Sequence, residues 1–129
     1  MKEVDDLIGI LKSIESSSFK EIKEEWLAPY PNIPGNLKYL YEKLGYGSIG
    51  GRYTIHALIE PDEIYDSETA KCLNGIVIVG DDFAGNCDAY DTKADWQFGS
   101  IGHDGVFEPD EEDDFISFLT GWFTDEDKE

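Results

Sequence analysis

Apolar residues recur at helical spacing near the start of the chain. From Val4 to Ile14 they lie three or four residues apart, which predicts a helix from Val4 to about Phe19. A second helical pattern begins at Pro34, a residue that suits the first turn of a helix, and runs to Leu44. The first third of the chain therefore contributes two helices.

A third helical pattern lies close to the end of the chain. Its apolar residues follow the spacing i, i+3, i+4, i+7 and i+8, typical of a helix with one buried face. They are Phe115, Phe118, Leu119, Trp122 and Phe123. This stripe predicts a C-terminal amphipathic helix with Trp122 in the core, followed by an acidic tail at 124–129 that we expect to fray.

Between these helices the pattern is that of strands. The apolar run Ile76–Val79 ends in a turn rich in glycine and aspartate, and the segment Cys87–Tyr90 leads back, which predicts a hairpin. Further strands are predicted at Tyr53–Leu58, Trp96–Ile101 and Val106–Phe107. We expect a loop through the glycines at 45, 47, 50 and 51, and an irregular segment at Pro61–Lys71 with at most one helical turn.

Helices thus flank a central run of strands, which favours an α+β fold. We expect one domain over residues 1–129, with a core at about 4–123 and a mostly antiparallel sheet flanked by helices. The oligomeric state, monomer or dimer, stays open, since an exposed edge strand would support a dimer.

The chain is strongly acidic for its size, with a net charge of −19 over 129 residues. Residues 1–65 carry 11 acidic and 7 basic side chains, a net of −4, whereas residues 66–129 carry 18 and 3, a net of −15. Such a field repels nucleic acid and anionic membranes and attracts basic proteins. Charge alone favours a plainer interpretation, in which the acidity gives solubility or reflects a salty habitat.

Other sequence features indicate the cellular compartment in which we expect the protein. The start of the chain lacks the basic and apolar regions of a secretory signal, and no apolar run approaches a membrane span. Cys72 and Cys87 have neither C-x-x-C nor zinc spacing, so we expect both to be reduced and partly buried in a cytoplasmic protein.

Three blocks of sequence together resemble the SUKH superfamily, which includes the Smi/Knr-like regulatory domains and many bacterial immunity proteins. The blocks are IPGNLKYLYEKLGYGSIGG at 33–51, IVIVGDDFAGNCDAYD at 76–91 and DDFISFLTGWF at 113–123. They occur in the order that the superfamily shows and span most of the chain. The segment 92–107 departs from its pattern.

The resemblance implies a function in protein binding. Bacterial members are commonly immunity proteins that bind and neutralise a cognate toxin domain, often a nuclease or deaminase, inside the producing cell. The acidic charge agrees with this reading, because a nuclease needs a basic surface for its substrate. The alternative that the resemblance allows is a regulatory interaction module of the Smi/Knr type, without a toxin partner. Both readings predict a protein that is not an enzyme and uses no cofactor.

The partner-binding candidates are acidic residues near turns and one tryptophan. Trp96 is included because tryptophan is enriched at binding hot spots, although packing is the default for it. The candidates are Asp81, Asp82, Asp88, Asp91, Asp95, Trp96, Asp110, Glu111 and Glu112.

The sequence gives less support to a catalytic site or a metal site than to protein binding. The aspartates at 81, 82, 88 and 91 lack EF-hand spacing, so solvated turn carboxylates are the favoured interpretation over a Ca²⁺ or Mg²⁺ site. Cys87 has no histidine in a recognisable signature, and His56 and His103 form no metal-binding pair. The string G-x-G-x-x-G at 45–50 follows a helix instead of a strand and is interpreted as a loop.

Overall fold

The computed structural model describes residues 1–124 of the 129. Its α-helices are α1 (Lys2–Ser13), α2 (Glu24–Leu27), α3 (Gly35–Lys43), α4 (Ser67–Cys72) and α5 (Phe115–Thr124). Its strands are β1 (Ser18–Lys20), β2 (Tyr46–Ile49), β3 (Tyr53–Ile59), β4 (Ile76–Asp81), β5 (Cys87–Asp91), β6 (Gln97–Ile101) and β7 (Phe107–Pro109). No helix within this part of the chain has the length and apolar character that crossing a membrane requires.

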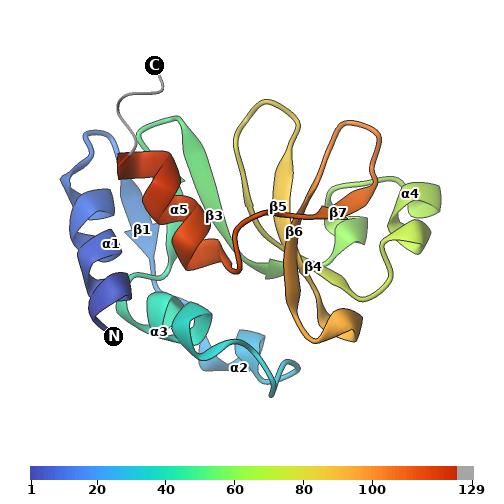
Figure 1. Cartoon of the computed structure of the whole chain (residues 1–129), viewed down its shortest axis with the longest axis horizontal. Coiled ribbons are helices and arrows are strands. Elements are labelled where there is room, and N and C mark those ends of the chain that lie inside the picture. Colours follow the sequence, from blue (N-terminus) through green and yellow to red (C-terminus); the bar gives the residue numbers. More distant parts are fainter. Residues whose placement is uncertain (125–129) are drawn as a thin grey trace.

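The seven strands form one sheet in chain order, β1 to β7, and every neighbouring pair is antiparallel (Figure 1). This confirms the predicted α+β domain with a central antiparallel sheet and a C-terminal helix. The predicted hairpin is the β4–β5 pair, in which Val77 lies opposite Tyr90.

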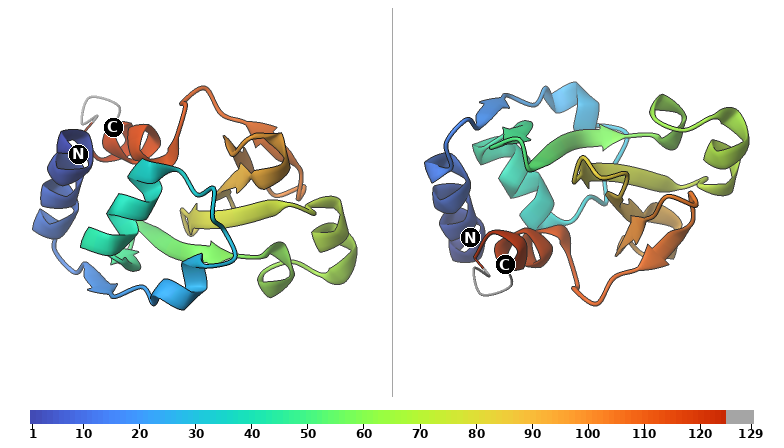
Figure 2. Two further views of the ribbon diagram at one scale, coloured as in Figure 1. Left: turned by 90° about the horizontal axis from the view of Figure 1, so that it is seen from below. Right: turned by 90° about the horizontal axis from the view of Figure 1, so that it is seen from above.

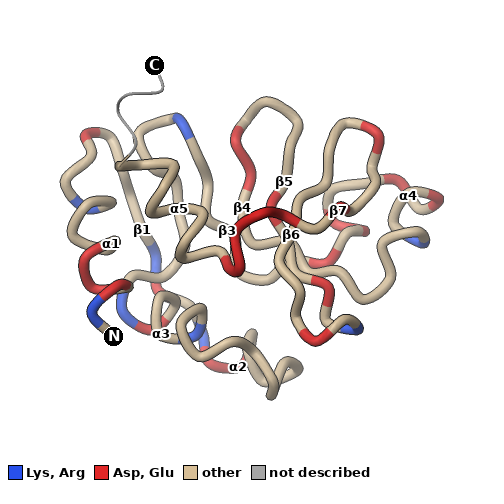
Figure 3. The backbone as a smooth tube through the Cα atoms, viewed as in Figure 1, with Lys and Arg blue, Asp and Glu red and all other residues tan. Residues whose placement is uncertain are grey.

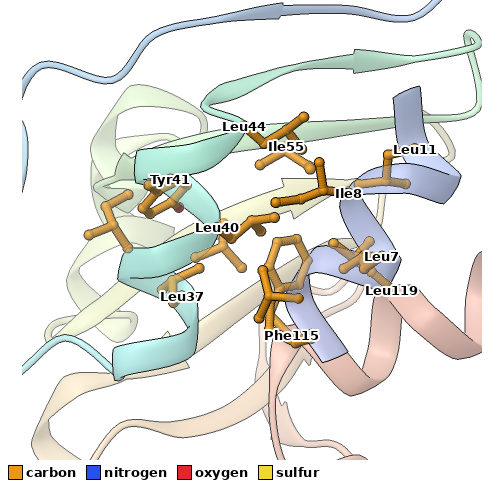
Figure 4. Close-up of a cluster of buried hydrophobic side chains, with 14 of the residues drawn as sticks. Leu7, Ile8, Leu11, Leu37, Leu40, Tyr41, Leu44, Ile55, Phe115 and Leu119 are labelled. Atoms are coloured by element: carbon orange, nitrogen blue, oxygen red, sulfur yellow. The ribbon is translucent and has the colours of Figure 1, made fainter. Parts of the chain in front are cut away.

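Helices α1, α3 and α5 together bury the larger core against one face of the sheet (Figures 1 and 4). Leu7 of α1, Leu40 of α3 and Leu119 of α5 are fully buried beside Ile55 of β3. The spacing of apolar residues in these helices directs one stripe of each toward this core. The core therefore ties both ends of the chain to the middle strands.

A smaller core covers the other face of the sheet. Val77 and Val79 of β4 belong to the larger core, whereas Ile76 and Ile78 point to the smaller one, where Leu73 at the end of α4 packs on them. Because both faces of β4 are covered, its sequence is an unbroken apolar run instead of an alternating one.

The N-terminal elements differ from those predicted. The first helix ends at Ser13, and Ser18–Lys20 forms the edge strand β1. The expected glycine loop contains strand β2, which pairs with β1 and β3. A side chain at Gly47 would collide with the backbone oxygen of Ser18, so glycine here allows the two strands to approach.

The segment Pro61–Lys71 is more regular than predicted. Pro61–Glu63 forms a 3₁₀-helix, η1, in which Glu60 and Glu63 complete a capping box. Helix α4 follows, with Asp66 accepting a hydrogen bond from the Thr69 N–H at 2.8 Å. These short helices depend on capping side chains and carry too few apolar residues to show a periodic signal.

Trp122 was wrongly placed in the core. Its side chain is 38% exposed, at the margin of the larger core, with its ring centroid 5.7 Å from that of Tyr53. The apolar stripe of α5 is wider than the surface that covers it. Thr124 is the last residue of α5, and the remainder of the predicted tail, 125–129, lies outside the described residues.

Candidate functional site

The predicted contact residues lie in separate regions of the fold. They are, in chain order, Asp81 and Asp82 at the β4–β5 turn, Asp88 within β5, Asp91, Asp95 and Trp96 around the β5–β6 turn, and Asp110, Glu111 and Glu112 in the loop before α5. The two turns are at opposite ends of β5. Figure 3 shows the loop before α5 as a continuous acidic run across the front of the sheet. These residues therefore do not form one compact patch.

A groove of about 780 Å³ gathers part of this set around Trp96. The start of α1, the start of α3, the β5–β6 turn and the loop before α5 form it. Its lining includes Glu3, Asn36, Asp95, Trp96, Asp113 and Asp114. This Trp96 groove contains two of the predicted residues, Asp95 and Trp96, and joins them to the acidic loop through Asp113 and Asp114.

An unusual backbone conformation places Trp96 in the groove. Asp95 and Trp96 both have φ of +58°, a left-handed value that is rare for a bulky side chain such as tryptophan. The ring is half-buried and packs against two tyrosines, with centroids 6.1 Å from Tyr30 and 5.7 Å from Tyr90. Strained residues of this kind persist only when the surroundings hold them, and they are frequent at functional sites.

Hydrogen bonds hold the opposite wall of the groove. Asp114 accepts from the Ser117 N–H at 2.8 Å, which caps α5, and from the Asn36 side-chain amide at 3.0 Å, which links α5 to α3. The Phe115 N–H donates to the Tyr90 hydroxyl at 2.8 Å. Both walls are thus arranged before any partner binds, which lowers the entropic cost of binding.

The groove is strongly acidic. Glu3, Asp95, Asp113 and Asp114 line it, and Lys93 is the one lysine or arginine among its described lining residues. A half-buried tryptophan between exposed carboxylates matches the side chains of a basic protein, which combine an apolar stem with a cationic head.

The β4–β5 turn presents an aromatic residue that the sequence reasoning missed. Phe83 is 58% exposed, with φ of +65°. Asp82 fixes the turn by accepting hydrogen bonds from the Ala84 N–H at 2.8 Å and the Asn86 N–H at 3.2 Å. Although partial burial opposes ionisation, these bonds hold the pKa of Asp82 below its usual value. The sequence did contain a sign that this aromatic side chain is exposed, because Phe83 lies within a cluster of turn residues.

Asp88 is the one predicted contact residue that is buried, so the expectation of a solvated turn carboxylate is wrong for it. Its side chain is 6% exposed and accepts a hydrogen bond from the Tyr53 hydroxyl. Asp88 and Tyr90 are two residues apart in β5, so both point toward the larger core. Burial, opposed by the Tyr53 hydrogen bond and reinforced by nearby Asp110, raises the pKa of Asp88 to about 7. Asp88 therefore cannot contact a partner without local opening.

The other polar cluster lies on the opposite face of the sheet. His56 Nε2 is 2.6 Å from an Asp81 carboxylate oxygen, and the Tyr65 hydroxyl donates to Cys87 Sγ at 3.4 Å. Burial raises the pKa of the Cys87 thiol, which is the opposite of what a nucleophile requires. Cys87 is buried as expected, whereas Cys72 is exposed, contrary to the prediction. Within residues 1–124, no group of three or more His, Cys, Asp or Glu side chains is arranged to hold a metal ion.

Comparisons with models of protein families, with curated proteins and with solved structures found no match to this chain. The likeness to the SUKH superfamily therefore rests on the three sequence blocks alone. These blocks correspond to α3 with β2, to the β4–β5 hairpin and to α5, which are mainly core and turn elements. The Trp96 groove is lined partly by Asn32 and the β5–β6 turn, outside all three blocks.

Proposed function

We propose that this chain is a cytoplasmic immunity protein that binds a basic toxin domain and blocks its active surface. The observation that carries the proposal is the Trp96 groove, in which a half-buried tryptophan lies between preorganised acidic walls. The toxin would be a nuclease or deaminase, whose substrate requires a basic surface. The three sequence blocks that resemble the SUKH superfamily support this proposal independently.

Two physical effects contribute to binding of the toxin, one at long range and one on contact. The net charge of −15 in residues 66–129 attracts a basic partner over a distance and accelerates association, mainly at low salt. Contact then depends on Trp96 and the carboxylates beside it, because buried aromatic residues contribute most of the binding energy at interfaces. Neutralisation is steric and electrostatic, without a chemical step.

The test begins with a pull-down from lysate of the source cells at low and raised salt, with mass spectrometry of the retained proteins. We expect the pull-down to retain a basic toxin that is released by raised salt. This toxin should kill host cells unless this chain is co-expressed. A salt-resistant complex with a housekeeping protein would favour the regulatory module instead. Failure to protect cells from the toxin encoded beside this chain would reject the proposal.

Charge-matched variants locate the contact. Asp95→Asn with Asp113→Asn removes two carboxylates from the groove, and asparagine tolerates the left-handed backbone at position 95. Glu68→Gln with Glu108→Gln removes the same charge from exposed positions outside the groove. We expect the first pair to weaken toxin binding and protection more than the second. Equal effects of the two pairs would place the contact elsewhere.

A further inference from the structure

We infer that a second groove, formed beneath α2, binds the side chain of an arginine or lysine from a basic polypeptide segment. This Trp26 groove has a volume of about 740 Å³ and lies between α2, β2, β3 and η1. Trp26 comes from α2 and Tyr46 from β2, whereas Glu60 and Glu63 come from the segment around η1. Figure 2 shows α2 beside β3, seen from both sides.

The walls of the groove are aromatic. Trp26 is 37% exposed, and its ring meets that of Tyr46 edge-on with a centroid distance of 5.8 Å. Tyr30 lines the groove next to them. The Nζ of Lys23, which does not line the groove, already lies 5.8 Å from the Trp26 ring centroid. The contact with Lys23 shows that this ring accepts a cation at cation–π distance. The exposed part of Trp26 lines the groove and is the part open to a second cation.

The rim of the groove is anionic. Its exposed carboxylates are Glu25, Glu60, Asp62 and Glu63. Among residues 1–124, no lysine or arginine lines the groove or forms an ion pair with any of these four. Burial, and then the negative charge of Glu60, raise the pKa of Tyr30 in the same groove. Glu60 accepts a hydrogen bond from the Tyr30 hydroxyl at 3.4 Å and Glu63 one from the Glu60 N–H at 3.1 Å, so these carboxylates have neutral donors but no cation as partners in residues 1–124.

The floor of the groove is an irregular part of β3. Between the pairs Ile55–Gly80 and Ile59–Ile78, strand β3 has more residues than β4, and Leu58 has φ of +45°. This bulge interrupts the regular pairing beside α2. It explains how a groove opens in the middle of a sheet instead of at its edge.

The combination selects one class of occupant. An anion is repelled by the rim, and an apolar side chain leaves the carboxylates without compensation. The side chain of arginine or lysine has an apolar stem that packs on Trp26 and Tyr46 and a cationic head that reaches Glu60 and Glu63. The inference does not depend on the toxin hypothesis, because any basic segment supplies this side chain.

The three tryptophans of the chain make a residue-resolved test feasible, since each gives one indole N–H signal in a ¹H–¹⁵N NMR spectrum. The probe is the pentapeptide Gly-Gly-Arg-Gly-Gly, titrated to about 20 mM because so few contacts bind weakly. The control peptide carries citrulline, a neutral analogue of arginine. We expect a saturable shift of the Trp26 signal with the arginine peptide and little change with citrulline.

Protein variants separate the groove from general charge. Glu60→Gln with Glu63→Gln retains the hydrogen-bonding groups of the capping box and is expected to weaken binding at least fivefold. Glu21→Gln with Glu108→Gln removes the same charge outside the groove and is expected to leave binding within twofold. Any of three results would overturn the inference. These are equal shifts of all three indole signals, an equal response to the arginine and citrulline peptides, or an equal loss of binding in both variants. A shift of Trp96 alone would also overturn it, yet would leave the proposed toxin site intact.

Discussion

The hydroxyl of Tyr53 donates a hydrogen bond to the carboxylate of Asp88, beneath the aromatic residues of α5. Tyr53 on β3 is fully buried, and Asp88 on β5 is nearly so. No lysine or arginine among residues 1–124 forms an ion pair with Asp88, so its charge is stabilised by one hydroxyl. This pair is a costly polar contact inside an apolar core.

The pair predicts that the protein becomes less stable as pH rises from about 4 to about 7. The pKa of Asp88 is raised to about 7 in the fold, by burial in the first place, against about 3.9 in an unfolded chain. Between these values the folded state binds the additional proton, so stability falls by up to about 1.4 kcal/mol per pH unit toward pH 7 and then levels off. Urea unfolding at a series of pH values measures this slope.

Asp88→Asn is the matching variant, because its amide oxygen still accepts from Tyr53 and carries no charge. We expect it to be more stable than the natural protein at pH 8, of similar stability near pH 4, and without this part of the pH slope. An unchanged slope in Asp88→Asn would show that other groups cause the pH dependence.

Gly80 allows Tyr53 to reach Asp88, and its replacement by alanine is expected to be destabilising. A Cβ at position 80 would collide with the hydroxyl and ring of Tyr53. Overpacking of this kind costs about 1–3 kcal/mol. Gly121 is the control, because it lies on the exposed side of α5 and a Cβ there meets nothing within 4 Å. Gly121→Ala is expected to add up to about 1 kcal/mol of stability, and thermal unfolding of the two variants should shift in opposite directions.

The two cysteines are expected to differ in reactivity. Cys72 is exposed, whereas Cys87 is buried and burial raises the pKa of its thiol. A thiol reagent such as Ellman's reagent should modify one thiol per chain rapidly and the second only on unfolding. Cys72→Ser should abolish the rapid phase. A rapid phase that survives in this variant would show that the face of the sheet around Cys87 opens readily.

The sequence predicted those elements whose residues carry a strong period. The hairpin around Val77 and the helix from Phe115 are examples, since their apolar residues reveal which faces are buried. Strand β1 is only three residues long and lies at the sheet edge, and β2 contains Gly47, so neither shows such a period. Their pairing is a tertiary effect.

For the same reason, the sequence predicted only Asp95 and Trp96 among the residues that line the Trp96 groove. Asp95 and Asp113 are distant in sequence and line one groove only in the folded chain, where the Asn36–Asp114 hydrogen bond joins α3 to the start of α5. The burial of Asp88 did have a signal, because the period of two in β5 places it on the same face as Tyr90. That period was outweighed by the composition of the turn, which is typical of solvated carboxylates.

The left-handed backbone at Asp95 predicts that stability and binding oppose each other there. With φ of +58° and ψ of +38°, Asp95 occupies a conformation that costs an ordinary residue about 1–3 kcal/mol and costs aspartate or asparagine less, whereas glycine adopts it freely. Asp95→Gly should therefore raise stability by about 0.5–1 kcal/mol, after allowing for the greater freedom of glycine in the unfolded chain. Ala94→Gly, one residue earlier in a 3₁₀-helix, should lower it.

Asp95→Gly also removes a carboxylate from the Trp96 groove, so we expect it to bind the basic partner more weakly although it unfolds at a higher temperature. Calorimetric unfolding and a binding assay on the same preparations compare the two effects. If Asp95→Gly loses both stability and affinity, Asp95 serves only the local fold. If it gains stability and keeps full affinity, the carboxylate is not part of the contact surface. A strained aspartate that weakens the fold and strengthens binding is what selection for a partner, and not for stability, would retain.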